Sequence, residues 1–371
     1  MRFLIFSNFY FPINNNFILF ILIIIEIKMN FPSIFLRKET INNEYRTPLI
    51  PSHVKILINN GYKVYVEKSE NRCFRDIEFI KAGAILVNEK WYNFKDSLIL
   101  GIKELDNLNL LDNHTHIYFS HSFKNQTNSK IILDAFKKSN SKLYDLEYFL
   151  NNNKRIISFS FFAGIVGVLL GFKQYYFKIN YGRNIDNLRI SKCYLDILIE
   201  LKNFNIDRKI KVGLIGPNGK SGRGAKYILK FLSEAFPIEI AYYYKNTPKN
   251  NLKENDILIN CINLTENIGT WFDENTKFHK KIVIVDVSCD YTNKNNPIKI
   301  YDSKTTWENP IYQYNQYVDI IAIENLPSLI PYDSSKYFSG KLKDLLIDLK
   351  NGDNNFWENN LKIFYEKISI I

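Results

Sequence analysis

A chain of 371 residues with 46% hydrophobic and 23% charged residues is long enough for about two globular domains, each with its own core. The net charge of +11 comes from lysines scattered along the chain, with no run of five basic residues, so it does not indicate a nucleic-acid-binding protein. Four cysteines lie far apart and form no C-x-x-C pair, which indicates neither a zinc site nor a disulfide framework and fits a reducing cytoplasm.

The N-terminus contains an apolar run, residues 17–25, whose role has three interpretations. The run is too short to cross a membrane, since a spanning helix needs about 20 apolar residues. It has the length of the apolar core of a signal peptide, but no small-residue cleavage site follows. Alternatively, Met29 is the native start and residues 1–28 are an extension. We expect no membrane partner.

Helical and strand patterns alternate from residue 35 onward. After a short strand, a helix is predicted to begin near Ser52, a plausible N-cap, and to end before Gly61. A strand over 63–67, a helix over 77–81 and a strand over 84–87 follow. This alternation predicts a mostly parallel sheet.

Two later strands end in side chains that can carry protons. The apolar run 98–102 leads into Lys103 and Glu104, and the run 116–120 leads into His121. In an open α/β sheet the ligand crevice lies beyond the carboxyl ends of the strands. If the strands are parallel neighbours, Lys103 and His121 share that crevice and can divide acid–base work near neutral pH. A solvated lysine and a histidine bonded to backbone are the plainer alternatives.

The middle of the chain contains an acidic segment and a long apolar one. Residues 143–148 are predicted to form a strand with Asp145 and Glu147 on one face. Residues 156–171 are the most hydrophobic interior stretch, shorter than a membrane span, and predict a buried inter-domain helix at the hinge. Its small residues would let another backbone pack closely against it.

A second domain is organised around a glycine-rich turn. Residues 210–215 have the pattern of a buried parallel strand, and helical spacing resumes from Ala225. Between them stand Gly216, Gly219 and Gly222, three residues apart. A strand, a glycine turn and a helix N-terminus together form an anion site. The turn alone leaves open a dinucleotide site or a plain tight turn.

Further strands are predicted at 238–243, 256–261 and 281–287, as in a dinucleotide-binding domain. The carboxylate that normally takes the ribose hydroxyls is not evident, because the first of these strands runs into tyrosines and then Lys245. After a proline-punctuated return near residue 327, helices over 334–349 and from about 355 suggest that the chain completes the first domain.

Nine segments carry a family resemblance. They are RKETINNEYR (37–46), GIKEL (101–105), HSFKNQ (121–126), LYDLEYF (143–149), SFFAGIVG (160–167), GPNGKSGRGA (216–225), VDVSCD (285–290), NPIKIY (296–301) and ENLPSLIP (324–331). Together they resemble saccharopine dehydrogenase of the NAD-dependent, lysine-forming type, kin to alanine dehydrogenase. The resemblance runs in order from about residue 35 to the C-terminus. Members of this family typically begin only a few residues before the segment that RKET matches, which favours Met29 as the native start.

The resemblance implies an α/β fold with two Rossmann-like domains, mostly parallel sheets and an active-site cleft between them. Residues 29–158 plus 325–371 would form the substrate domain, and residues 159–324 the NAD-binding domain. It also implies a cytoplasmic enzyme, which we expect to be a monomer. Its small-molecule partners would be saccharopine, lysine and 2-oxoglutarate, with NAD as cofactor and no metal.

The implied reaction is the oxidation of saccharopine's secondary amine by NAD, followed by water addition and release of lysine and 2-oxoglutarate. Lys103 would handle protons at the substrate amine. His121 would be the acid–base group for the addition of water and for the collapse of the resulting carbinolamine. Glu44 matches a glutamate that tunes the lysine, since a nearby carboxylate raises a lysine's pKa.

Other site residues are carried over by the same resemblance. Positions that match substrate contacts are Arg46, Lys124, Gln126, Arg155, Phe159, Ser288, Cys289 and Asp290, with Glu104 and Glu147 as nearby carboxylates. Positions that match cofactor contacts are Lys154, Gly216, Gly219, Lys220, Gly222, Asn263, Val287, Ile323, Glu324, Asn325 and Leu326.

Three departures separate this chain from the family pattern. Ile41 stands where the family can carry a lysine, so one cationic substrate contact is lost. Ser221 stands where a cysteine can pair with the Cys261 position, so that disulfide cannot form. The missing ribose carboxylate weakens the preference for NAD over NADP. The alternatives are a sister amino-acid dehydrogenase of the alanine dehydrogenase type and a non-catalytic binding protein.

Overall fold

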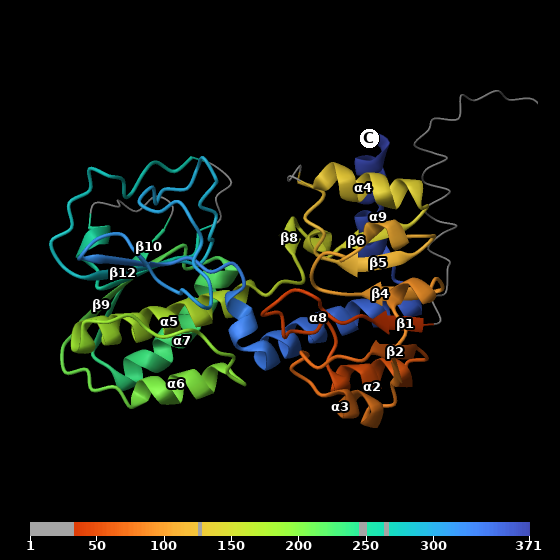
Figure 1. The fold of residues 1–371 in the computed structure, drawn as a ribbon, viewed down its shortest axis with the longest axis horizontal. Coiled ribbons are helices and arrows are strands. Elements are labelled where there is room, and N and C mark those ends of the chain that lie inside the picture. The colour runs from red at the N-terminus through yellow and green to blue at the C-terminus, as the bar shows by residue number, and fades with distance from the viewer. Residues whose placement is uncertain (1–32, 125–127, 245–250, 263–266) are drawn as a thin grey trace, which may run out of the picture.

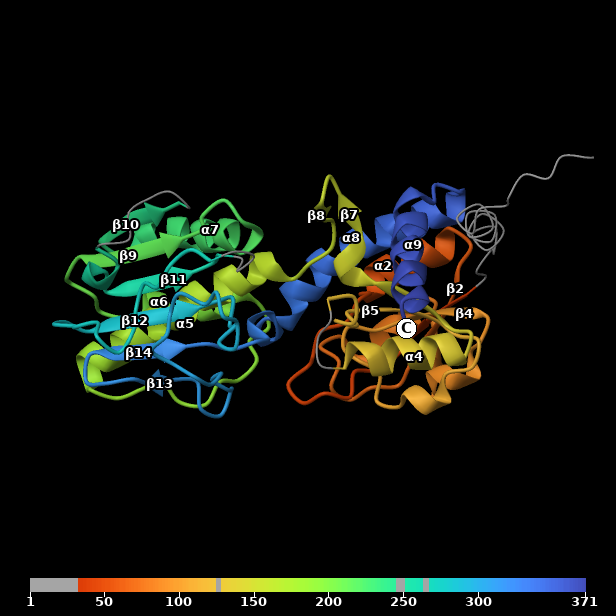
Figure 2. The same ribbon diagram turned by 90° about the horizontal axis from the view of Figure 1, so that it is seen from above.

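The computed structural model describes residues 33–124, 128–244, 251–262 and 267–371. The chain forms two α/β lobes that lie side by side along the long axis of the molecule (Figures 1 and 2). Each lobe is built on a six-stranded sheet, and the predicted α/β class with mostly parallel sheets is confirmed. No helix among the described residues is long and apolar enough to cross a membrane.

The sheet of the first lobe is entirely parallel, in the order β3-β2-β1-β4-β5-β6. Its strands are β1 (Ser33–Leu36), β2 (Lys63–Glu67), β3 (Ile85–Val87), β4 (Ser97–Leu100), β5 (Thr115–Tyr118) and β6 (Lys142–Asp145). Because all six run in one direction, their carboxyl ends meet at a single edge of the sheet. The strands that precede Lys103 and His121 are parallel neighbours there, which is the condition for the two residues to share a crevice.

Helices from both ends of the chain cover this sheet. They are α2 (Pro51–Asn59), α3 (Asp76–Lys81), α4 (Ser129–Lys138), α8 (Pro331–Asn351) and α9 (Asn355–Ser369). Short 3-10 turns are η1 (Trp91–Asn93), η2 (Leu108–Leu110) and η3 (Leu146–Tyr148), and β7 (Leu150–Asn151) pairs with β8 (Lys154–Arg155). The C-terminal helices contribute Phe338, Trp357 and Phe364 to the same core as the strands.

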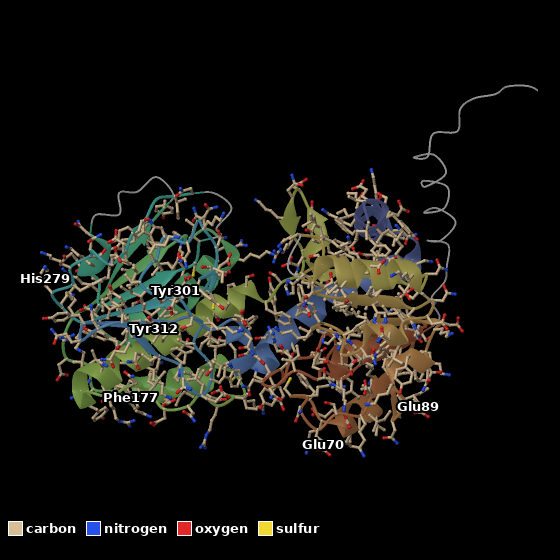
Figure 3. The ribbon with its side chains drawn as sticks, turned by 45° about the horizontal axis from the view of Figure 1, so that its top comes forward. Glu70, Glu89, Phe177, His279, Tyr301 and Tyr312 are labelled. Atoms are coloured by element: carbon tan, nitrogen blue, oxygen red, sulfur yellow. The ribbon has the colours of Figure 1, made fainter. Side chains whose placement is uncertain are left out.

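The second lobe has the sheet order β10-β9-β11-β12-β14-β13, antiparallel only at β13. Its strands are β9 (Ile210–Ile215), β10 (Ile238–Tyr243), β11 (Ile257–Asn260), β12 (Ile282–Asp286), β13 (Tyr312–Gln313) and β14 (Val318–Ile321). Its helices are α5 (Ser160–Tyr181), α6 (Tyr194–Lys202) and α7 (Lys220–Ala235), with the turns η4 (Leu252–Glu254) and η5 (Leu326–Leu329). At the β13 edge, Tyr301 and Tyr312 pack with ring centroids 6.5 Å apart (Figure 3).

Helix α5 corrects one prediction. It begins at Ser160, four residues after the expected start, and continues to Tyr181, where Gly182 ends it in the left-handed conformation with φ +64°. Its buried side chains belong to the core of the second lobe, where it packs on α7 and β12, so it does not lie between the lobes. The chain first crosses between the lobes in the short segment just before it.

Close packing of α5 on α7 depends on glycines, as the small residues of the apolar stretch predicted. A Cβ on Gly164 would overlap the carbonyl of Ser221, and a Cβ on Gly224 would overlap the carbonyl of Phe161. The two helix backbones therefore approach through facing glycines. This contact fixes the start of α7, and with it the glycine turn, against the connection between the lobes.

We expect Gly224→Ala to lower the free energy of unfolding by about 1–3 kcal/mol, because the added methyl group overpacks the helix contact. Gly340→Ala in α8 is the matched control. Its Cβ would meet the nearest atom, on His53, at an ordinary 3.6 Å, so helix propensity should raise stability by up to about 1 kcal/mol. Urea unfolding of both variants measures the difference. Equal stability of the two variants would contradict the packing role.

Candidate active site

Three loops at the carboxyl edge of the first sheet carry predicted site residues. Lys103 follows β4, His121 follows β5, and the loop that starts at Arg37 follows β1. The ladder continues past the strand ends, since Gly101 N–H bonds the Ile117 carbonyl at 3.0 Å and Phe119 N–H bonds that of Ile102 at 3.1 Å. The edge is therefore rigid where Lys103 leaves it.

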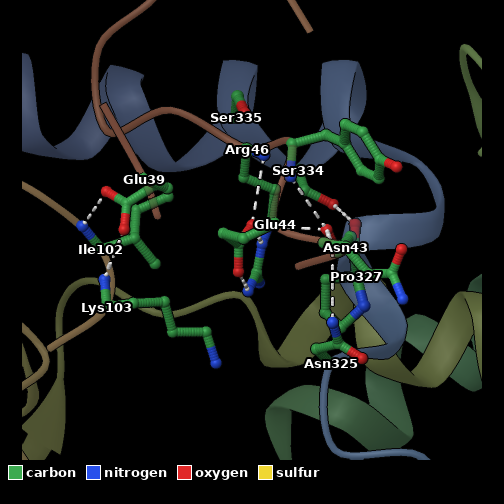
Figure 4. A network of polar contacts seen from close by, with 12 residues as sticks. Glu39, Asn43, Glu44, Arg46, Ile102, Lys103, Asn325, Pro327, Ser334 and Ser335 are labelled. Carbon is green, nitrogen blue, oxygen red and sulfur yellow. Dashed lines mark hydrogen bonds and ion pairs between the residues drawn. The ribbon is translucent and has the colours of Figure 1, made fainter. Parts of the chain in front are cut away.

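The backbone of Lys103 is anchored, whereas its amine has no hydrogen bond or ion pair with the part of the chain that the structure describes. The Glu39 carboxylate accepts the N–H groups of Ile102 at 2.7 Å and Lys103 at 3.0 Å. The Lys103 side chain extends away from Glu39, on the side where Glu44 and Arg46 lie (Figure 4). Burial and the neighbouring Arg46 lower its pKa, against the opposing carboxylates of Glu44, Glu324 and Glu39. A larger share of the amine is therefore neutral near physiological pH.

Glu44 and Arg46 form a buried ion pair in two hydrogen bonds, at 2.7 Å from Nε and 2.6 Å from Nη2 of Arg46. The guanidinium also lies 4.1 Å from the centroid of the Phe159 ring, which stacks on Phe338 at 4.3 Å. Burial raises the pKa of Glu44, but Arg46 outweighs it and the net pKa is lowered. Glu44 is therefore ionised, and Arg46 is held between a carboxylate and an aromatic face.

His121 is held in an unusual backbone conformation with φ +55°. Its ring stacks on Phe119, with ring centroids 6.4 Å apart. The preceding Ser120 donates to Asp145 at 2.6 Å, and Asn360 of α9 bonds both the N–H and the carbonyl of Asp145, at 3.0 and 2.8 Å. The histidine loop is thus fixed by the end of β6 and by the C-terminal helix.

The predicted strand over 143–148 is wrong beyond Asp145. The Asp145 carboxylate accepts the N–H of Glu147 at 2.8 Å and turns the chain into η3, so the two carboxylates do not share a strand face. Glu147 instead pairs with Lys124 at 2.6 Å and Arg155 at 3.0 Å. Burial raises the pKa of Glu147, but the two cations together lower it. The predicted cationic anchors Lys124 and Arg155 therefore meet at one carboxylate.

The glycine turn of the second lobe is built for close backbone approach. Gly216 has φ +72°, and a Cβ there would meet the Cys261 carbonyl at 3.1 Å. A Cβ on Gly222 would overlap the Gly216 carbonyl, so Gly222 serves packing within the turn. Gly219 has ordinary space around it and is the N-cap of α7, where no side chain caps the helix and no acidic residue lies in the first turn. The start of α7 thus suits an anionic group.

Lys220, the first residue of α7, reaches across to the first lobe. Its amine donates to the carbonyl of Arg155 and lies 3.2 Å from the Ser158 hydroxyl. Burial lowers its pKa, as do Arg155, Arg223 and Lys341. The glycine turn is therefore tied to β8, the strand that carries Lys154, whose side chain is exposed.

The end of β12 is organised by Asp286, a buried acceptor. It takes hydrogen bonds from Asn260 at 3.0 Å, the Ser288 hydroxyl at 2.5 Å and the Tyr301 hydroxyl at 2.5 Å. The next buried side chain, Cys289, has φ +49°, and burial raises its pKa to about 12. Val287 and Ser288 are half-buried and Asp290 is exposed, so this loop presents polar groups at the sheet edge.

The predicted segment 323–326 divides into two kinds of residue. Ile323 and Leu326 are buried, and their side chains belong to the core of the second lobe. Glu324 is exposed and pairs with Lys304 at 2.7 Å. Asn325 donates to the Asn43 carbonyl at 3.4 Å, a contact between the lobes (Figure 4).

Several residues of this site escaped sequence reasoning. Ser328 donates to the Asn43 carbonyl at 2.6 Å and lies 3.3 Å from Glu44, while Glu39 and Asn360 fix Lys103 and the His121 loop. Glu39 and Ser328 lay within the segments that carry the resemblance, but only contacts far apart in sequence reveal their roles. Gln126 and Asn263 lie outside the described residues.

Comparison with known proteins gives three findings. Residues 35–166 match the alanine dehydrogenase/PNT N-terminal domain family. The NAD⁺-dependent, L-lysine-forming saccharopine dehydrogenase of Emericella nidulans is 32% identical over 367 residues, covering 91% of this chain and 98% of that protein. The protein of the same name from Candida glabrata is 34% identical over 335 residues, covering 84% and 90%.

Solved structures show the same fold at low sequence identity. An L-alanine dehydrogenase has a TM-score of 0.65 at 18% identity, covering 89% of this chain and 93% of that one. A transhydrogenase from Sinorhizobium meliloti has a TM-score of 0.60 at 15% identity, covering 84% and 91%. These likenesses support the two-lobe architecture.

Proposed function

The chain belongs to the family of NAD-dependent, L-lysine-forming saccharopine dehydrogenases, and on that premise we propose that it converts saccharopine to L-lysine and 2-oxoglutarate. The observation that carries this proposal is the placement of Lys103. Its partly buried amine lies beside the Glu44–Arg46 pair, and the neighbouring strand ends at His121. Two proton-transfer groups and a guanidinium at one sheet edge suit the oxidation of an amine that carries carboxylates.

The second lobe suits NAD as the cofactor, which when bound accepts the hydride from saccharopine. Gly219 and the uncapped first turn of α7 would hold the pyrophosphate. Lys220 would add a positive charge beside it, and Val287 would line the site at the next sheet edge. Asn325 joins this region to the loop that carries Glu44 and Arg46.

Lys103 takes the proton from the secondary amine of saccharopine as the C–H bond is oxidised. Its lowered pKa favours the neutral, accepting form. Glu39 keeps the backbone of Lys103 in place while the proton moves, because it bonds peptide groups and not the amine. Lys103 returns the proton to the lysine nitrogen when the carbon–nitrogen bond breaks.

His121 serves the water step. It removes a proton from the water that attacks the oxidised carbon and releases that proton to solvent. The neutral imidazole then accepts the hydroxyl proton as the carbonyl of 2-oxoglutarate forms. The Ser120–Asp145 hydrogen bond and the stack on Phe119 hold its ring and loop in one orientation. In the proposed mechanism the imidazole acts in the same crevice as the Lys103 amine.

The substrate's carboxylates require cationic anchors. Arg46, Lys124 and Arg155 are the candidates, and each is paired with Glu44 or Glu147 in the structure. We propose that substrate carboxylates share these cations with the two glutamates, since a guanidinium offers more donors than one carboxylate can accept. Phe159 holds Arg46 in place through its ring face.

The first lobe would bind the substrate and the second the cofactor. We place the boundary just before α5, because one core runs from Ile34 to Phe159 and resumes at Phe338, whereas the next core begins at Phe162. The crossing back lies between η5 and α8. The reaction would then take place between facing sheet edges of the two lobes.

We propose that the protein works as a monomer in the cytoplasm, and the cysteine chemistry fits that compartment. All four cysteines are free thiols. Burial raises the pKa of Cys73 and of Cys289 to about 12, so both are neutral and unreactive at physiological pH. A reducing compartment suits such a chain.

A substrate panel tests the proposal. Saccharopine, alanine, and lysine plus 2-oxoglutarate are each combined with NAD or NADP in the matching redox state, and nicotinamide absorbance is followed. We expect reduction of NAD with saccharopine, oxidation of NADH with lysine plus 2-oxoglutarate, and no reduction with alanine. Activity with alanine instead of saccharopine would overturn it.

Glu44→Gln is expected to move the acid limb of kcat/KM for saccharopine to lower pH. Glu44 raises the pKa of Lys103 and Arg46 lowers it, so removing the carboxylate leaves the guanidinium unopposed. The neutral lysine then persists to lower pH. A pH profile against Glu70→Gln, an exposed carboxylate of the same lobe, measures the shift. A limb that moves to higher pH would refute Glu44 as the group that tunes Lys103.

A further inference from the structure

We propose that Arg37 and Glu39 are positioning residues for the reaction, which hold the peptide groups of Lys103 so that its amine reaches the substrate. This inference rests on the proposed function of Lys103. Glu39 accepts both N–H groups, from Ile102 at 2.7 Å and Lys103 at 3.0 Å, and Arg37 donates to the Lys103 carbonyl. Both residues come from the loop after β1, more than sixty positions earlier in the chain.

Glu39 takes the place of a missing sheet partner. Strand β4 ends at Leu100, and the ladder with the neighbouring strand ends with the Ile102 carbonyl. Beyond it, the N–H groups of Ile102 and Lys103 face the β1 loop, and a buried N–H without a partner is costly. One carboxylate satisfies both, so the chain leaves the sheet at a defined angle.

The Arg37–Glu39 pair is buried, which indicates that it positions Lys103 more than it stabilises the fold. Arg37 is 4% exposed and Glu39 is 8% exposed, and their charged groups lie 3.6 Å apart. A buried ion pair recovers little free energy beyond the cost of its desolvation. Arg37 Nε has no hydrogen-bond partner among the described residues, an additional cost that the pair retains.

Gly101 is shaped for this contact. A Cβ at this position would overlap the Arg37 guanidinium at Nε, so only glycine lets the side chain pass beside β4 to the Lys103 carbonyl. Gly101 does not have a positive φ, and its conformation alone therefore does not require glycine. The glycine of the G-I-K-E-L segment thus leaves the space that the arginine of the R-K-E-T segment fills.

The residues around Lys103 fall into two groups, those that bind its backbone and those that lie near its amine. Arg37 and Glu39 bind backbone groups, and in Figure 4 the amine points away from Glu39. Glu44 and Arg46 lie on the amine's side, where burial and Arg46 lower its pKa and Glu44 raises it. Loss of Glu39 should therefore lower kcat by misplacing the amine, with little change in KM for NAD.

A cavity beside Glu39 allows a direct test by chemical rescue. It has a volume of about 650 Å³, opens to solvent, and is lined by Glu39 with Lys38, Thr40, Lys68, Ser69 and Asn88 among others. A small carboxylate such as formate can enter from this side. It could replace the two oxygens that Glu39→Ala removes, and the lysines of the cavity favour its negative charge.

The experiment measures kcat and KM for saccharopine oxidation in Glu39→Ala with and without formate. We expect kcat to fall about 10²-fold, the effect of a small misplacement of a reacting group. Formate should restore it at least severalfold in this variant, and not in wild type or in Lys103→Met. Glu39→Gln keeps the volume but accepts only one N–H, and should lose about tenfold. Glu70→Ala, at the rim of the same cavity, is the control.

Amide hydrogen exchange separates this inference from the proposed function, because it needs no substrate. Exchange over residues 101–105 should quicken in both Glu39 variants, while exchange of the β4 strand stays unchanged. Native kcat in Glu39→Ala, a lost kcat that formate does not restore, or unchanged exchange over 101–105 would each overturn the proposal. If wild type fails to oxidise saccharopine, the proposed function fails, and exchange still decides the role of Glu39.

Discussion

Lys103→Met and His121→Gln are each expected to lower kcat for saccharopine oxidation by about 10²-fold or more, the contribution typical of positioned acid–base groups. Methionine keeps the length of the Lys103 side chain but cannot take a proton. Glutamine keeps a hydrogen-bonding group after β5 but cannot take up or release a proton. Because the two residues act on different proton transfers, each variant should slow the reaction by itself.

Steady-state kinetics with saccharopine and NAD measures both effects against matched controls. Lys68→Met removes an exposed lysine at the end of β2, on the same sheet edge. His279→Gln removes an exposed histidine at the outer side of the second lobe (Figure 3). Both controls should keep native kcat. Undiminished turnover in Lys103→Met or His121→Gln would remove that residue from the mechanism.

Arg46→Met is expected to lower the free energy of unfolding by about 3–5 kcal/mol, because it leaves the Glu44 carboxylate buried and unpaired. Glu44 is 3% exposed, and both bonds to the guanidinium would be lost together with the contact to the Phe159 ring. Urea unfolding at neutral pH measures the loss. A variant as stable as wild type would contradict the pairing.

The stability loss of Arg46→Met is expected to depend on pH. In wild type the pKa of Glu44 is lowered, so the stability that the pair contributes is present above the ordinary carboxyl pKa and is lost as the pH falls through the lower, folded value. Without Arg46, burial raises that pKa against the opposing effect of Lys103, so the deficit of Arg46→Met should shrink as acid protonates Glu44. Glu44→Gln/Arg46→Met should recover part of the loss at neutral pH.

Strands with a continuous apolar pattern could be predicted almost to the residue. β2 and β10 have the expected bounds, because β-branched and aromatic residues stand between clear turn positions. β14 (Val318–Ile321) was not predicted, and it carries Asp319 inside the sheet. That carboxylate is buried and bonded to Gln174 at 2.8 Å and Lys178 at 3.3 Å, both on α5. Such partners, far away in the chain, are not visible in a local pattern.

The candidate site likewise has one part that the sequence predicts and another that depends on contacts between distant segments. The placement of Lys103 and His121 after neighbouring strands follows from one rule, that parallel strands end at a common edge. The contacts that fix these residues do not, because they join distant segments. Asn360 reaches Asp145 only after the C-terminal helices return to the first lobe, and Lys220 reaches the Arg155 carbonyl only once α7 is packed on α5.

The central claim is that this chain cleaves saccharopine oxidatively at the site between Lys103 and His121. The most direct test is product analysis of the purified protein with saccharopine and NAD. We predict lysine, 2-oxoglutarate and NADH in equal amounts, with none formed by Lys103→Met beyond about 1% of the wild-type rate. NADH formation from alanine, or saccharopine left intact by the wild-type protein, would contradict the account.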